Sequence, residues 1–144
     1  MKKTERQKNN VAPNEDEHAF RAARLSRLAE ELESPAAARA YASAFLRMFP
    51  GRIQRIVNSL RDGDKPAAMD AVLSLKVNSH IVGALTIEQD CLSLERHLLA
   101  DQHIAPALVA ATLTTHGASL TPALMEYLSK GPAISVEAEL SPMS

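Results

Sequence analysis

The stretch Val72-Leu-Ser-Leu-Lys-Val-Asn-Ser-His-Ile-Val-Gly-Ala84 carries two columns of residues at helical spacing. Each residue of an α-helix turns by about 100°, so residues three and four apart share a side. Four residues on one side alternate in such steps, and we expect them to face a core. They are Val72, Leu75, Ser79 and Val82. The second column points away from that core and consists of Leu73, Lys76, Val77 and His80. The stretch therefore predicts a helix with one buried side and one exposed or half-exposed side.

Helix starts and stops surround this stretch on its N-terminal side. Asp62-Gly-Asp64 predicts a turn, and Asp64 is placed to cap a helix from about Lys65 to Val82. Further upstream, Ser34-Pro35 predicts the start of another helix. Its two apolar stripes are separated by Pro50-Gly51, where we expect a kink, because one bundle can bury both halves. The stripes are Tyr41, Phe45, Met48 and Phe49, followed by Ile53, Ile56, Val57 and Leu60.

Three further helices are predicted from the same kind of signal. The first runs from about Asp16 to Leu32. After the central stretch, Thr86-x-x-Gln89 has capping-box spacing and predicts a helix to about Leu99. The last begins near Ile104 and extends toward Lys130, with possible breaks at Gly117 and at Thr121-Pro122. The expected apolar faces are Ala22, Leu25, Ala29 and Leu32 on the first helix, and Ile87, Cys91, Leu94 and Leu98 on the one before last.

These elements predict an all-α fold. Alanine and leucine are abundant and β-branched residues are scattered, which favours helices over strands. Short turns between long amphipathic helices predict an antiparallel up-and-down four-helix bundle with an additional N-terminal helix. We expect this bundle to span residues 15–130, between disordered tails at 1–14 and 131–144.

Composition argues against several functional classes. The chain has no run of about 18 apolar residues, so no membrane span is expected. Its charged N-terminus lacks the apolar segment of a secretory signal, which predicts a cytoplasmic protein. A net charge of −1 and an aromatic content of 3 % argue against nucleic acid as a partner. The single cysteine, Cys91, falls on an apolar stripe and is expected to be a buried, inert thiol.

The central helix resembles the site helix of histidine-containing phosphotransfer (Hpt) domains. In that family the phosphate-accepting histidine is followed by leucine and lysine two and three places on, then by small residues and a Gly-Ala pair. The matching residues here are Leu75, Lys76, Ser79, Gly83 and Ala84. The resemblance spans about residues 36–100, including Phe45 to Pro50, Ile53, Leu60, Gly63-Asp64, Cys91 and Leu94-Glu95.

Two positions depart from the family pattern. Leu73 stands where the family has its histidine, and Val77 stands where it has a small residue. In the family an imidazole nitrogen attacks the acyl phosphate of a receiver domain's aspartate, and leucine has no lone pair for that attack. The resemblance therefore implies a non-enzymatic module, without a cofactor or metal, that docks a receiver domain or histidine kinase. The expected docking surface is Leu73, Lys76, Val77 and His80.

Alternatives remain open at this point. His80 lies in the same column as Leu73, two turns on, and is a candidate for a displaced phosphate acceptor. The chain is also compatible with a helical interaction module outside phosphorelays. A metal site formed by His97, Asp101 and His103 is conceivable, although their spacing matches no recognised ligand pattern.

Overall fold

The structure, a computed structural model, describes the backbone of residues 19–143 and the side chains of residues 19–130. Within this range the chain is all-helical, which confirms the predicted fold class. The predicted tail at 1–14 and the predicted helix start at Asp16 lie outside the described residues. None of the described helices is both long and apolar enough to cross a membrane. The helices are α2 (Ala22–Leu32), α3 (Pro35–Arg61), α4 (Lys65–Val82), α5 (Leu85–Leu99) and α6 (Pro106–Met143).

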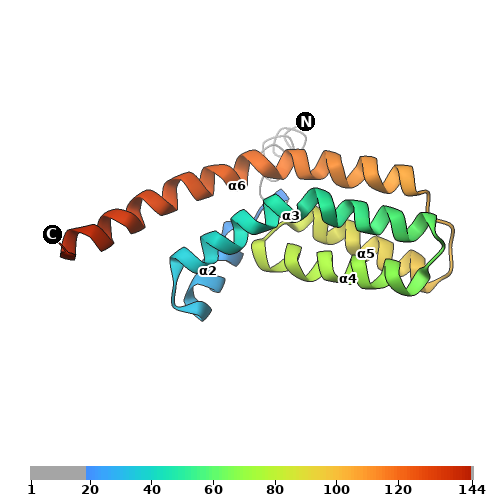
Figure 1. Cartoon of the computed structure of the whole chain (residues 1–144), viewed down its shortest axis with the longest axis horizontal. Coiled ribbons are helices and arrows are strands. Elements are labelled where there is room, and N and C mark those ends of the chain that lie inside the picture. The colour runs from blue at the N-terminus through green and yellow to red at the C-terminus, as the bar shows by residue number, and fades with distance from the viewer. Residues whose placement is uncertain (1–18, 144) are drawn as a thin grey trace, which may run out of the picture.

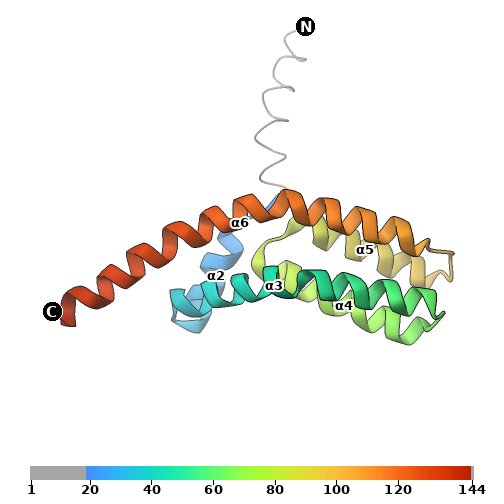
Figure 2. The ribbon, with the colours of Figure 1, turned by 45° about the horizontal axis from the view of Figure 1, so that its top comes forward.

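Helices α3, α4, α5 and α6 lie side by side and alternate in direction (Figure 1). Helix α3 packs along both α4 and α6, and α4 packs along α5, as the turned view also shows (Figure 2). Helix α5 also contacts α6, and this contact is smaller than the contacts α3–α4, α3–α6 and α4–α5. Helix α2 covers one end of α3 and α4. The connections 62–64 and 83–84 are short, which favours close packing of the helices that they join.

Helix α3 continues through Pro50-Gly51, and its direction changes along its length (Figure 1). Packing against α6 outweighs the local penalty of the proline here. The contact is close at Gly117, where an added Cβ would lie 2.3 Å from Cε2 of Phe49. Gly117 therefore admits the Phe49 ring and does not break α6, contrary to the possible break predicted there.

Helix α6 also passes through Thr121-Pro122, the second predicted break. The Thr121 hydroxyl donates to the carbonyl of Gly117 at 2.8 Å, within the helix. The helical backbone then extends past Lys130 to Met143, where the sequence predicts a tail from residue 131. The helix end predicted near Lys130 is therefore wrong, because glycine and proline lower helix preference without ending every helix.

The first and fourth predicted helices begin elsewhere than expected. Helix α2 starts only at Ala22, because Arg21 is extended and its N–H donates to the carbonyl of Gly83 at 2.8 Å. Helix α5 starts at Leu85 with Ala84 at the N-cap position. Thr86 lies inside its first turn, so the predicted capping box does not start the helix. The other two caps are confirmed, since Ser34 and Asp64 accept from the N–H groups of Ala37 and Ala67.

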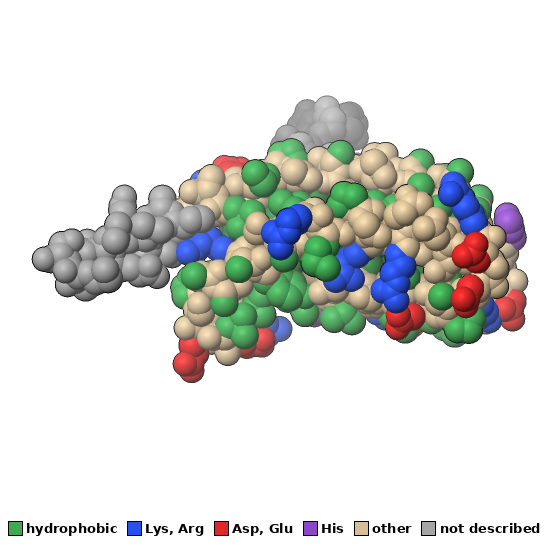
Figure 3. Space-filling model, in the orientation of Figure 1, with side chains coloured by type: hydrophobic (Ala, Val, Ile, Leu, Met, Phe, Trp, Pro, Cys, Tyr) green, Lys and Arg blue, Asp and Glu red, His purple; other side chains and the backbone are tan. Residues whose placement is uncertain are grey.

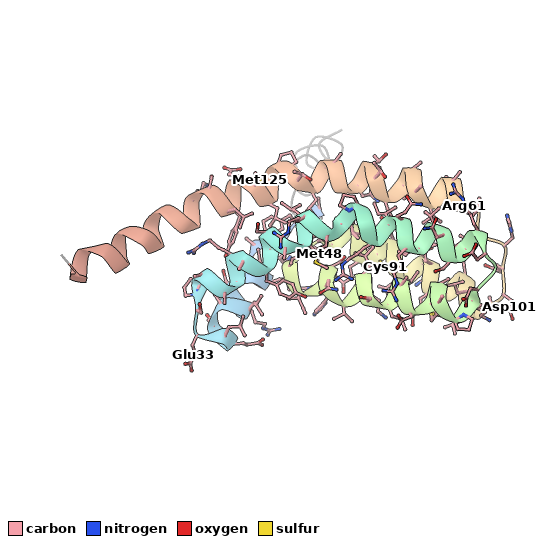
Figure 4. The ribbon with its side chains drawn as sticks, in the orientation of Figure 1. Glu33, Met48, Arg61, Cys91, Asp101 and Met125 are labelled. Carbon is pink, nitrogen blue, oxygen red and sulfur yellow. The ribbon has the colours of Figure 1, made fainter. Side chains whose placement is uncertain are left out.

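The core is built from the inward sides of all five helices. Phe45 and Phe49 stack with ring centroids 5.7 Å apart, and Cys91 is fully buried, as predicted (Figure 4). Three residues of the expected apolar faces are instead on the surface, with Met48 47 % and Leu32 49 % exposed and Ala22 exposed at the start of α2. Met48 lies about 100° around the helix from Phe49, at the edge of the stripe. Leu32 is the last residue of α2, at the end of the helix.

Candidate docking surface on α4

Helix α4 has the bounds that the sequence predicts, and both of its ends are fixed. Asp64 caps its start, with the Ala67 N–H 3.1 Å from the Asp64 carboxylate. Gly83 ends it at φ +86°, a left-handed conformation that glycine adopts without strain. A Cβ on Gly83 would also lie 2.2 Å from the carbonyl oxygen of Arg21. The segment before α2 therefore holds the end of α4 in place.

The inward side of α4 is the predicted one. Val72, Leu75, Ser79 and Val82 are each at most 1 % exposed. The Ser79 hydroxyl oxygen is buried without a hydrogen-bond partner, so it serves as a small packing residue. The rotation of the helix about its axis is therefore confirmed.

The outward side carries the four predicted docking residues together. Val77 is 54 % exposed, His80 is exposed, and Leu73 and Lys76 are half-buried. Leu73 and Val77 are one turn apart and form the apolar centre of this side. We call the four residues Leu73, Lys76, Val77 and His80 the α4 surface.

Polar contacts border the α4 surface on both sides. Toward α5, Lys76 Nζ lies 2.7 Å from Glu95 Oε1. Toward α3, Arg52 donates to the Ser74 hydroxyl at 2.8 Å, and Arg55 pairs with Asp70 at 2.5 Å. Basic and acidic side chains are likewise interspersed on the face of the molecule in Figure 3. The ammonium group of Lys76 is thus already engaged by a carboxylate.

His80 makes contacts that its sequence position does not reveal. Its Nδ1 lies 2.8 Å from Glu88 Oε2 on α5 and 2.9 Å from an Arg24 guanidinium nitrogen on α2. The same nitrogen of Arg24 donates to the His80 carbonyl at 2.8 Å. Because Nδ1 can donate to Glu88 or accept from Arg24 but not do both, the position of one proton selects between the two contacts. These contacts join α2, α4 and α5.

A second histidine has a partner that the sequence analysis did not find. His116 Nδ1 on α6 lies 2.5 Å from Asp90 Oδ2 on α5. Burial raises the pKa of Asp90, and the contact with His116 opposes that shift. No local signal links residues 26 positions apart. The pair becomes visible only when the rotation of both helices is known.

The conceivable metal site does not assemble. Among residues 19–130, no three histidine, cysteine or acidic side chains gather closely enough to hold a metal ion. Asp101 pairs with Lys65 at 2.5 Å, and His97 Nδ1 contacts the Ser93 carbonyl at 2.7 Å. Burial raises the pKa of the Cys91 thiol to about 12, which keeps it in the unreactive form.

Comparison with known proteins yields no significant match to any family model, curated protein or solved structure. The resemblance to Hpt domains therefore rests on the spacing of residues in this chain alone.

Proposed function

We propose that this protein is an Hpt-like signalling module that docks a receiver domain or a histidine kinase without accepting phosphate. In this proposal α3 to α6 form an antiparallel four-helix bundle, and α2 is the additional helix. The observation that carries it is the position of Leu73, which is on the outward, half-exposed side of α4 beside the exposed Val77. A leucine at that position keeps a contact surface but removes the nucleophile.

The composition of the α4 surface suits docking. Protein interfaces commonly have a small apolar centre, which excludes water, and a polar rim. Leu73 and Val77 supply such a centre, and the pairs Lys76–Glu95 and Arg55–Asp70 lie beside it. Binding depends on this surface and needs no phosphoryl chemistry.

The proposal is tested by titrating the protein with receiver domains from the same genome, some of them carrying labelled phosphate. We expect saturable binding to at least one receiver and no label on this protein. An acid-labile label on this protein would refute the claim that it accepts no phosphate. Absence of binding to every receiver and kinase domain would instead favour an interaction module outside phosphorelays.

Restoring the acceptor is a second test. If Leu73 occupies the acceptor position, Leu73→His should introduce phosphate acceptance from a receiver that the protein binds. Val77 adds bulk beside this position, so the double variant Leu73→His/Val77→Ala should accept phosphate faster than the single one. If the double variant binds the receiver but never becomes labelled, the equivalence of Leu73 with the family's histidine is wrong.

A second candidate function uses His80 as a displaced phosphate acceptor. Its support is the contact of Nδ1 with Glu88, which would orient the ring, and the nearby guanidinium of Arg24. Against it, His80 lies about 10 Å along the helix from position 73, which misplaces it for a receiver docked in the usual way. Label transfer that His80→Ala abolishes and His97→Ala leaves intact would favour this candidate. His97 is the control because it is another exposed histidine.

A further inference from the structure

A cleft of about 240 Å³ lies between α5 and α6, whose mutual contact is the smallest in the ring of four helices. Val109 and Leu113 line it from α6 and belong to the buried core, while Leu94 and Ile104 are half-buried. The lining from α5 extends over residues 90–97, or about 12 Å of helix. The cleft therefore has room for a small molecule with an aliphatic body.

The polar groups of the cleft include hydrogen-bond acceptors at both ends. Asp90 lines one end, and an ionised carboxylate only accepts hydrogen bonds. His97 lines the other end, where its Nδ1 lies 2.7 Å from the Ser93 carbonyl. A carbonyl only accepts, so Nδ1 of the neutral ring carries the proton and Nε2 is left as an acceptor.

The charged and titratable groups of the lining are few. They are the Asp90 carboxylate and the imidazoles of His97 and His103, and the lining contains no lysine or arginine. His116 contacts only Oδ2 of Asp90, and a carboxylate offers about four lone-pair sites. Burial disfavours the ionised form of Asp90 and raises its pKa, so a cation in the cleft would offset that penalty.

We propose that the cleft between α5 and α6 binds a small amphiphilic primary amine, with its aliphatic body against Val109 and Leu113 and its ammonium group on Asp90. An alcohol would gain the apolar contacts without the charge-assisted bond. A carboxylate of the same length would be repelled by Asp90. This site uses different helices from the α4 surface, and its test does not depend on receiver docking.

The test uses three matched probes, hexylammonium, hexan-1-ol and hexanoate, titrated into the full chain and followed by backbone amide NMR shifts. Saturable shifts over residues 90–97 and 104–113 are expected for hexylammonium. Its affinity should exceed that of hexan-1-ol, since charge-assisted bonds are roughly twice as strong as neutral ones. It should exceed that of hexanoate by about tenfold or more, since Asp90 repels a carboxylate. Equal affinities for the three probes, or no saturable shift in these segments with hexylammonium, would refute the proposal.

Two variants distinguish the contribution of the Asp90 charge to binding from that of the space in the cleft. Asp90→Asn should weaken hexylammonium about tenfold and leave hexan-1-ol unchanged, whereas Asp70→Asn, in the exposed pair with Arg55, should change neither. Thr112→Phe keeps Asp90 but fills the cleft from its half-buried edge, so it should abolish binding of both probes. If Asp90→Asn or Thr112→Phe keeps the native amide spectrum and still binds hexylammonium as tightly as the unmodified protein, the amine does not bind in this cleft.

Discussion

On the inner side of α4, Val72, Leu75 and Val82 are at most 1 % exposed, whereas on the outer side Val77 is 54 % exposed and Leu73 is half-buried. Both sides carry apolar side chains, but the core explains only the inner ones, because burial there removes whole side chains from water. In the Hpt resemblance, Leu73 stands at the acceptor position and Val77 at the position of a small residue. Stability should therefore depend on the inner side, and partner binding on the outer one.

Shortening one leucine on each side gives the largest expected contrast. Leu75→Ala removes a fully buried side chain and should lower the free energy of unfolding by about 2–5 kcal/mol. Leu73→Ala, on the half-buried side, should lower it by about 1 kcal/mol or less. Urea denaturation followed by circular dichroism measures both. Equal losses would mean that Leu73 is part of the core and that the two sides of α4 do not differ in their contribution to stability.

The end of α4 offers a second contrast, between two glycines with positive φ. Gly83→Ala should lower the free energy of unfolding by more than about 2 kcal/mol, because left-handed strain adds to a clash with the carbonyl of Arg21. Gly63 has φ +67° and open space around it, so Gly63→Ala should lose only about 1 kcal/mol. Thermal and urea unfolding report both values. Similar losses would show that Arg21 does not hold the end of α4.

Two serine residues on α4 give a third and smaller contrast, in which one substitution is expected to stabilise the protein. Ser79→Ala removes a buried hydroxyl that has no hydrogen-bond partner and should raise the free energy of unfolding by about 0.5–1 kcal/mol. Ser74→Ala should not stabilise, since the Ser74 hydroxyl accepts from Arg52. The two variants can be compared by urea midpoints. Destabilisation by Ser79→Ala would mean that its hydroxyl has a partner, such as water.

The parts of the fold that local chemistry determines were predictable from the sequence. Helix α4 begins after a capping aspartate, Asp64, and ends before Gly83, so its predicted bounds and its rotation are both confirmed. The all-helical class followed from composition and periodicity. The four residues of the α4 surface lie together because spacing on one helix fixes their mutual positions.

Features that depend on packing between helices could not be predicted in this way. Gly117 looked like a break because its role, contact with Phe49, involves another helix. The extended backbone at Arg21 likewise depends on Gly83. The contacts His116–Asp90 and His80–Glu88 need the relative rotation of two helices, which a single sequence does not give.

The most direct test of the docking claim is the receiver affinity of Leu73→Asp, measured by calorimetry beside Leu108→Asp. Leu108 is a 66 % exposed leucine on α6, so the control places the same charge on another part of the surface. We expect Leu73→Asp to weaken binding at least about tenfold, because a charge enters the apolar centre, and Leu108→Asp to bind like the unmodified protein. Unchanged receiver affinity of a folded Leu73→Asp variant would show that Leu73 is not part of the docking surface.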